Sequence, residues 1–396
     1  MRASPGASRG PPCLLEPPGI DREPDHSEEN CMNEGPTTQG NAPDSFEKVR
    51  AMSFPRVVLA GHGVLQEIGS VAKTLGLPTH GIIITGPRTQ ELAGHRTREI
   101  LRGAGFHMET LMSGEATLEE VGRLAQETER CGGEFLVAVG GGSRIDLAKL
   151  VAFRRRIPFL SVPTVASHDG ISSPRASLRG EDRETLSLTA AVPLAIVADT
   201  EVIARAPFRF LAAGCADVVS NITAVLDWRL AQRLRSEEFS SSAAALAEYA
   251  AREIMDHASL IKSGLEESVW VAIRPIIMSG IAMSMANSSR PSSGSEHLFA
   301  HALLRLRPMD VLHGEAVGIG TIMMAHLHGE DWKLVRNVLR EIGAPTTAGA
   351  LGLETEEIVA ALVNAHTIRP ERYTILGDRG LTPDAAQRLA RFTGVV

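Results

Sequence analysis

Residues 135–153, FLVAVGGGSRIDLAKLVAF, set an all-apolar run directly before three glycines and a helix-patterned segment. Glycine lets a backbone approach a ligand closely, and N–H groups at the start of a helix suit a phosphate or pyrophosphate. A tight strand-to-helix turn without any ligand fits the same residues. The spacing is not Gly-x-Gly-x-x-Gly, which disfavours an ordinary Rossmann dehydrogenase. The stretch therefore predicts a strand–turn–helix unit, with ligand binding at the turn as one of two interpretations.

Apolar, β-branched runs alternate with helix-patterned segments on both sides of this unit. Strands are predicted at 56–60, 81–85, 106–112, 135–139 and 157–162, and helices at 63–75, 91–103 and 118–131. Such alternation is typical of a parallel sheet covered by helices on both faces. Beyond Asp199 almost every segment has apolar positions at helical spacing. We therefore predict an α/β fold, with a Rossmann-like parallel-sheet domain over residues 49–200, an all-helical C-terminal domain over residues 201–396, and the active site in the cleft between them.

The N-terminal segment has a different composition. Residues 1–48 are rich in proline, glycine and acidic side chains and have few periodic apolar positions. Such a segment cannot bury enough surface to offset its ordering entropy. It is predicted to be a disordered tail, with the folded protein beginning near Phe54.

Composition excludes several classes of protein. The chain of 396 residues has a formal net charge of -7 and a pI near 6.0, so it has no basic field for a nucleic-acid partner. Its four cysteines form no CxxC pair, which favours a reducing compartment. No apolar run is expected to approach the roughly 20 residues that span a bilayer, and the first residues lack a signal-peptide core. We expect a cytoplasmic protein that is not embedded in a membrane.

Three histidines lie in an apolar segment that has the pattern of a helical pair, residues 293–318, SGSEHLFAHALLRLRPMDVLHGEAVG. His297 and His301 are four residues apart and share a helix face, and His313 begins a new helix, whose positive end keeps the ring neutral. A satisfied core residue is the alternative for each histidine alone, but three in one hairpin favour a shared ligand. Asp217 is the candidate carboxylate, although a helix N-cap would explain it equally well.

Two motifs resemble a known family. Residues 140–149, GGGSRIDLAK, match the GGGSxxDxAK pattern of the superfamily of iron-alcohol dehydrogenases, glycerol dehydrogenases and dehydroquinate synthases. Residues 164–175, TVASHDGISSPR, are similar to the NAD(P)-dependent glycerol-1-phosphate dehydrogenases. Further matches occur at 196–207, 214–231, 294–303, 312–322 and 366–376. The resemblance covers about residues 55–390.

The resemblance implies a set of site residues. The metal ligands would be Asp217, His297 and His313, the substrate-binding residues Asp169, Asp217 and His301, and the catalytic residues His301 and Asp169. The residues that bind the coenzyme would be Gly142, Ser143, Arg144, Ile145, Asp146, Thr164, Val165, Ala166, Ser167 and Ser173. Iron-dependent relatives carry a fourth ligand, a histidine, where this chain has Asn221. Two histidines and one aspartate suit one catalytic Zn²⁺ per chain, and they also suit iron.

The implied reaction is the reversible reduction of dihydroxyacetone phosphate by NADPH or NADH to sn-glycerol 1-phosphate, the backbone of archaeal membrane lipids, by a cytoplasmic homo-oligomer. A glycerol dehydrogenase and a dehydroquinate synthase-type lyase are the alternatives. We hypothesise that His301 relays the proton, because a neutral imidazole titrates near working pH. Arg88 follows the second strand where NAD-specific relatives have an acid, which predicts use of both coenzymes. Arg175 and Arg290 are open candidates for binding phosphate.

Overall fold

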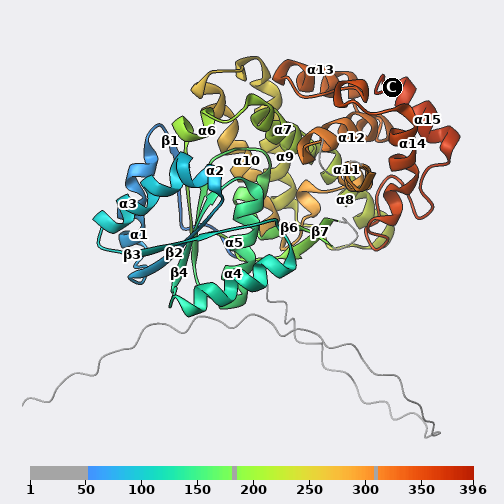
Figure 1. The fold of residues 1–396 in the computed structure, drawn as a ribbon. Helices are drawn as coiled ribbons and strands as arrows, with labels where there is room; N and C mark the ends of the chain where they lie inside the picture. The colour runs from blue at the N-terminus through green and yellow to red at the C-terminus, as the bar shows by residue number, and fades with distance from the viewer. Residues whose placement is uncertain (1–51, 181–184, 307–310) are drawn as a thin grey trace, which may run out of the picture. The chain divides into compact units, whose positions relative to one another are not determined.

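The computed structural model describes residues 52–180, 185–306 and 311–396 (Figure 1). The described residues form one compact unit. The predicted disordered tail over residues 1–48 lies outside the described residues.

Six parallel strands form one sheet in the order β1-β8-β5-β4-β2-β3. They are β1 (Val57–Gly61), β2 (His80–Thr85), β3 (His107–Met112), β4 (Phe135–Gly140), β5 (Phe159–Pro163) and β8 (Ala195–Asp199). Every residue of β4 is buried. Burial on both faces explains why such strands are continuous apolar runs in the sequence. The predicted parallel sheet is confirmed, and the five predicted strands correspond to β1 to β5.

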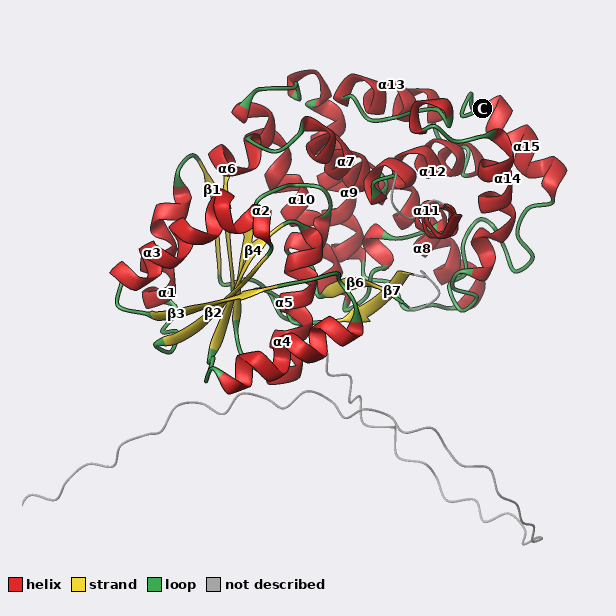
Figure 2. Ribbon diagram, in the orientation of Figure 1, coloured by secondary structure: helices red, strands yellow, loops and turns green. Residues whose placement is uncertain are grey.

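Helices cover both faces of this sheet (Figure 2). They are α1 (Ile68–Thr74), α3 (His95–Gly103), α4 (Leu118–Arg130) and α5 (Gly142–Arg155). Val137 of β4 belongs to a buried cluster with residues of α1 and α3, whereas Leu136 belongs to another with residues of α4 and α5. Successive side chains of a strand point to opposite faces, so β4 contributes to both clusters.

The glycine-rich turn lies at the carboxyl end of β4. The connection from β2 to β3 runs through α3 on one face of the sheet, and the connection from β4 to β5 runs through α5 on the other. β2 and β4 are neighbours in the sheet. The chain leaves β2 toward one edge of the sheet and leaves β4 toward the other edge, so the strand order reverses between them. Open α/β sheets bind ligands outside the carboxyl ends of strands at such a point. The fold therefore places Gly141 where a coenzyme is expected.

Some elements differ from the sequence prediction. An antiparallel hairpin, β6 (Arg175–Arg179) and β7 (Thr185–Thr189), follows β5 and was not predicted, and neither was β8. The segment predicted as one helix over 91–103 is not a single α-helix. A short helix α2 (Pro87–Thr89) and a π-helical turn, Gln90–Gly94, precede α3.

The rest of the chain is helical. The helices are α6 (Thr200–Ala204), α7 (Phe208–Val219), α8 (Asn221–Arg235), α9 (Ser241–Asp256), α10 (Glu266–Ala286), α11 (Ser295–Leu306), α12 (His313–Leu327), α13 (Trp332–Ile342), α14 (Thr355–Asn364) and α15 (Pro383–Phe392). Among described residues beyond Asp199, no strand occurs. One buried cluster joins Ile196 of β8 to Cys215 of α7 and Ile319 of α12. The change to helix at residue 200 is confirmed, and the division into two domains there stays a prediction.

Two apolar stretches are longer than the sequence analysis expected. Phe208–Arg235 and Glu266–Ala286 are long and apolar enough to cross a membrane by length and composition alone, so the expectation that no run approaches bilayer length is wrong. In the fold, 83% and 67% of their most apolar windows are buried inside the protein. Packing in the core accounts for their composition, since the core helices of a globular protein have the same apolar character.

Candidate active site

One cavity of about 720 Å³ joins the glycine-rich turn to the histidine cluster. At one end it is lined by Gly141, Gly142 and Ser143, where β4 passes into α5. At the other end it is lined by side chains of α7, α11 and α12. A dinucleotide and a small substrate therefore have one continuous space in which to meet.

Asp217, His297 and His313 converge at the helical end of this cavity. Asp217 lies in the last turn of α7, His297 in the first turn of α11, and His313 is the first residue of α12. Asp217 Oδ1 is 3.5 Å from Nε2 of each histidine, and the ligand atoms of all three residues lie within 4.8 Å of one another. This oxygen is buried and has no hydrogen-bond partner. An unpartnered buried carboxylate oxygen between two imidazole nitrogens fits a divalent cation.

Neighbouring groups fix the orientation of these side chains. Glu296, fully buried, accepts a hydrogen bond from His297 Nδ1 at 3.0 Å and another from the Thr223 hydroxyl at 2.8 Å. A carboxylate on the far nitrogen of a histidine holds the proton there and leaves Nε2 free to bind a metal. Asp217 Oδ2 accepts a hydrogen bond from the backbone N–H of Asp169 at 3.2 Å, so only Oδ1 remains available.

The pKa values reflect the attraction of this cluster for positive charge. Burial raises the pKa of Asp217, but contacts with His297 and His313 outweigh burial and bring it to about 2. Burial lowers the pKa of His297, whereas the nearby carboxylates of Asp217 and Glu296 outweigh burial and raise that pKa to about 9. Burial lowers the pKa of His313 to about 4. Two buried carboxylates therefore favour a cation at this position, and a divalent ion satisfies them without a proton on either imidazole.

The structure excludes one of the two interpretations of Asp217. Because Asp217 lies inside α7 and not before a helix, the N-cap alternative is wrong. Close packing brings His313 next to it. A Cβ at Gly314 would lie 1.9 Å from the carbonyl oxygen of Ala213, so only glycine lets the first turn of α12 lie this close to α7.

His301 is one turn after His297 in α11 and lines the cavity. Its Nδ1 is buried and has no hydrogen-bond partner. Burial, followed by the proximity of His313 and His297, places the pKa of His301 well below its ordinary value. A lowered pKa favours the neutral ring, and the proton relay by His301 stays a prediction.

Asp169 begins a short 3-10 turn after β5 and also lines the cavity. Burial, reinforced by Asp217, raises its pKa to about 6. One oxygen accepts a hydrogen bond from Ser279 at 2.8 Å, and Ser279 in turn accepts one from the Asn221 side chain at 3.0 Å. Asn221, at the position of the fourth ligand, thus serves to hold Asp169.

The predicted coenzyme residues separate into two groups. Those that line the cavity are Gly142, Ser143, Arg144, Asp146, Val165, Ser167 and Ser173. Ile145, Thr164 and Ala166 do not, because all three are buried, and the side chains of Ile145 and Ala166 pack in the apolar core. The part of these three residues in coenzyme binding stays a prediction.

Asp146 and Lys149 connect the coenzyme turn to the hairpin. Asp146 accepts hydrogen bonds from Lys149 Nζ at 3.3 Å and from the N–H of Ser177 at 3.1 Å. Lys149 is fully buried and also donates to the carbonyl oxygen of Arg175 at 2.7 Å. These contacts hold β6 against α5, so the lysine of the motif has a positioning role.

The arginines differ in their access to the cavity. Arg290 is buried, forms a bidentate pair with Glu237, and does not line the cavity, which removes it as a candidate for binding phosphate. Arg175 lines the cavity and is held to β7 by Ser187 and Thr189. Arg88 is exposed in α2, next to Thr89 at the cavity wall.

Arg369 lines the cavity near His301 and was missed in the sequence analysis. Burial lowers the pKa of its guanidinium, and no carboxylate of the described residues forms an ion pair with it. Behind it, Arg372 is fixed by donating to the Ser293 carbonyl at 2.6 Å and to the Ser289 hydroxyl at 2.8 Å. Its motif, residues 366–376, matched the family, but no local pattern showed that this segment returns to the cleft.

Comparison with known proteins shows the family to which this chain is similar. A family model described as iron-containing alcohol dehydrogenase matches residues 59–207. Curated proteins named glycerol-1-phosphate dehydrogenase [NAD(P)+] are similar over most of the chain. The one from Methanosarcina acetivorans is 52% identical over 87% of this chain and 96% of its own length, and the one from Pyrococcus horikoshii is 48% identical over 87% and 99%.

Solved structures show the same fold. Glycerol dehydrogenase from Schizosaccharomyces pombe has a TM-score of 0.71 at 20% identity, covering 88% of this chain and 91% of its own. An iron-containing alcohol dehydrogenase from Thermotoga maritima has a TM-score of 0.66 at 18% identity, covering 88% and 100%. The predicted two-part fold and the resemblance are both confirmed. By its sequence and its fold, the chain belongs to the glycerol-1-phosphate dehydrogenases, NAD(P)-dependent enzymes of the iron-containing alcohol dehydrogenase superfamily.

Proposed function

We propose that this protein catalyses the reversible NAD(P)H-dependent reduction of dihydroxyacetone phosphate to sn-glycerol 1-phosphate. The observation that carries the proposal is the unpartnered Asp217 Oδ1 between two imidazoles, in the same cavity as the glycine-rich turn. That arrangement puts a cation site and a nucleotide site within one space. The names of the relatives, at about half identity, support the choice of substrate.

Asp217, His297 and His313 would hold one Zn²⁺ per chain. A bound metal ion acts as a Lewis acid on the substrate oxygen and stabilises the negative charge that develops there. Three protein ligands of this type, with a further position left for substrate, are typical of catalytic zinc. Asn221 supports zinc over iron, since it hydrogen-bonds to Ser279 and to the Ala247 carbonyl instead of completing a fourth ligand.

Gly142 and Ser143 would hold the pyrophosphate of the coenzyme, because they begin α5 and their N–H groups are free at a helix N-terminus. The nicotinamide supplies or accepts the hydride. Ser167 and Ser173, further along the cavity, would orient the rest of the coenzyme through their hydroxyls. A side chain at position 142 would require the His168 ring to move, since a Cβ there would lie 1.7 Å from His168 Nε2.

Asp169 and His301 would bind the substrate beside the metal. Asp169 is positioned by Ser279 and by the contact of its N–H with Asp217. His301, kept neutral, has one ring N–H and one lone pair with which to bind and orient the substrate hydroxyls. In this proposal His301 would donate its ring N–H proton to the substrate oxygen while its other ring nitrogen accepts a replacement proton, so the ring stays neutral. His301→Gln, which keeps a donor and an acceptor, is expected to retain more turnover than His301→Ala.

Arg369 would bind the phosphate group of the substrate. It is a cation at the cavity wall, next to the proposed substrate histidine, and Arg175 and Arg372 increase the positive potential around it. A guanidinium pairs with two phosphate oxygens at once. This requirement for a phosphate separates the proposed reaction from that of a glycerol dehydrogenase.

Arg369→Ala is expected to raise the KM for dihydroxyacetone phosphate about 10- to 100-fold, since a hydrogen bond to a charged group contributes about 1.5–3 kcal/mol. The KM for NADPH and the weak rate with unphosphorylated dihydroxyacetone are expected to stay unchanged. Steady-state kinetics on the three substrates measure this. Arg340→Ala, an exposed arginine outside the cavity, is the matched control. An unchanged KM for the phosphorylated substrate would remove Arg369 from this role.

Arg88 would contact the 2′-phosphate of NADP and so permit the use of both coenzymes. Arg88→Ala is expected to raise the KM for NADPH about fivefold while leaving that for NADH unchanged, a modest effect because the side chain is exposed. Parallel titrations with the two coenzymes measure the ratio. Equal changes for both coenzymes would contradict this assignment.

The overall proposal is tested by NADPH oxidation with dihydroxyacetone phosphate, dihydroxyacetone and glycerol in parallel. The phosphorylated substrate should be strongly preferred, chelation should abolish the rate, and Zn²⁺ should restore it. A preference for the unphosphorylated compound would favour a glycerol dehydrogenase, and phosphate release without net NADPH oxidation would favour a lyase. We further propose a homo-oligomer that acts in the cytoplasm, which light scattering and cell fractionation would check.

A further inference from the structure

A second group of metal-ligating side chains lies on the sheet, away from the cavity. His80 is the first residue of β2, His107 is the first of β3, and Glu109 follows two residues later. In the parallel register His80 pairs with His107, and Ile82 pairs with Glu109. Both histidines lie at the amino ends of their strands, whereas the glycine-rich turn follows the carboxyl end of β4. The group is therefore at the opposite edge of the sheet from the coenzyme turn.

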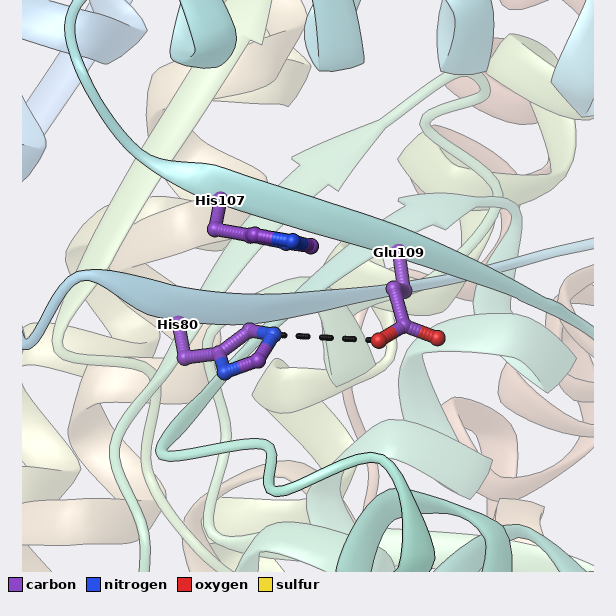
Figure 3. Close-up of side chains that lie close together, drawn as sticks. All are labelled: His80, His107 and Glu109. Atoms are coloured by element: carbon purple, nitrogen blue, oxygen red, sulfur yellow. Dashed lines mark ion pairs between the residues drawn. The ribbon is translucent and has the colours of Figure 1, made fainter.

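The three side chains approach one another closely (Figure 3). One ligand atom from each lies within 4.8 Å of the other two, and His80 Nε2 is 3.7 Å from a Glu109 carboxylate oxygen. The two imidazole centroids are 4.4 Å apart. Ligand atoms around one zinc ion lie roughly 3.3 Å apart, because each bond is about 2.0–2.1 Å long. Small side-chain rotations would complete such a set.

The backbone under the group is held in place. The N–H of His107 donates to the Thr79 carbonyl at 2.7 Å, and the carbonyl of His80 accepts from the N–H of Glu134 at 2.9 Å. Only side-chain rotation is therefore needed to bind an ion. The ligand positions are largely preorganised by the sheet.

The environment of His80 Nε2 is separate evidence for a cation at this position. This atom is shielded from solvent and has no hydrogen-bond partner, although other atoms of the ring are exposed. Its distance of 3.7 Å from Glu109 is too long for a hydrogen bond. A buried polar nitrogen without a partner is costly, and a bound cation would remove that cost.

We propose that His80, His107 and Glu109 bind a single divalent transition-metal ion, Zn²⁺ by preference, at a site separate from the active site. Two imidazoles and one carboxylate suit zinc, copper or nickel, and they do not suit Mg²⁺ or Ca²⁺, which prefer all-oxygen ligands. The ion would join the starts of β2 and β3. The thiol of Cys131 contacts the same Glu109 carboxylate, so the tests below use Cys131→Ser as the parent to exclude capture by sulfur.

The proposal is tested by the zinc content of the full-length chain after equilibrium dialysis. The pair His80→Ala and His107→Ala together should remove one ion per chain relative to the parent, and Glu109→Gln should weaken that ion's binding at least about tenfold, since even outer-shell partners contribute that much. Mg²⁺ should not compete. A zinc content of the double variant equal to that of the parent would overturn the proposal, whatever happens at Asp217.

Three controls keep the result interpretable. His95 pairs with Glu91 at 3.2 Å but has no third ligand in the described structure, so His95→Ala should keep the full zinc content. Asp217→Ala should lose the other ion and retain this one, which separates failure of this proposal from failure of the active-site assignment. NADPH oxidation by the His80→Ala/His107→Ala variant should equal that of the parent, which verifies its fold.

Discussion

Asp217→Asn is expected to lower kcat/KM for the reduction by about 10³-fold, equivalent to roughly 4 kcal/mol, because the variant loses the only charged group among the three proposed metal ligands. The substitution is nearly isosteric, and its amide oxygen can still accept the N–H of Asp169. The loss is therefore expected in metal binding and turnover, with little effect on stability. Steady-state kinetics and elemental analysis of the purified variant measure both quantities.

Glu296→Gln is the comparison for this experiment, because it is expected to lower metal affinity and activity less than Asp217→Asn does. Glu296 does not belong to the converging ligand group, and acts through its hydrogen bond to His297. Removing an outer-shell partner costs about 10- to 100-fold in metal affinity or activity, less than removing a ligand. If Asp217→Asn kept its metal and more than a tenth of its activity, the assignment of the cation site would be wrong.

Asp227→Ala is expected to destabilise the folded protein by about 3–5 kcal/mol, because it leaves buried donors unpaired. Asp227 in α8 is fully buried. It accepts hydrogen bonds from the N–H and hydroxyl of Ser295, both at 2.6 Å, from the N–H of Ile375 at 2.6 Å, and from His328 at 3.0 Å. The Asp227 carboxylate thus accepts four hydrogen bonds.

Thermal and urea unfolding of Asp227→Ala against the parent would measure this loss. Asp256→Ala is the matched control, since Asp256 is an exposed aspartate at the end of α9, and surface substitutions usually change stability by less than about 0.5 kcal/mol. A loss for Asp227→Ala within that range would show that its hydrogen bonds are replaced by water.

The parallel sheet could be predicted because its strands carry their own signal. A strand buried on both faces, such as β4, is a continuous apolar run that stands out from the helices around it. β6 and β7 carry no such signal, because they form a two-stranded hairpin with serine, threonine and arginine at alternate positions. β8 was missed although all of it is buried, because its five residues run directly into the helix that follows.

The active site could be predicted only in part. Local spacing placed His297 and His313 in one hairpin, whereas Asp217, about 80 residues earlier, could be assigned only by resemblance to a family. The charge state of His301 depends on burial and on neighbouring rings, neither of which is visible in a linear pattern. Arg369 depends on the path of the C-terminal segment, which Asp227 holds through Ile375.

The two oxygens of Asp217 have different partners, and this has a thermodynamic consequence. One oxygen faces the imidazoles of the helical half, and the other accepts the N–H of Asp169, two residues after a serine at the wall of the coenzyme channel. The Asp217 carboxylate therefore contacts both the proposed metal site and the coenzyme side of the cavity. If a metal ion and a coenzyme bind as proposed, each is expected to alter the affinity of the protein for the other, and linkage requires that the two changes in binding free energy be equal.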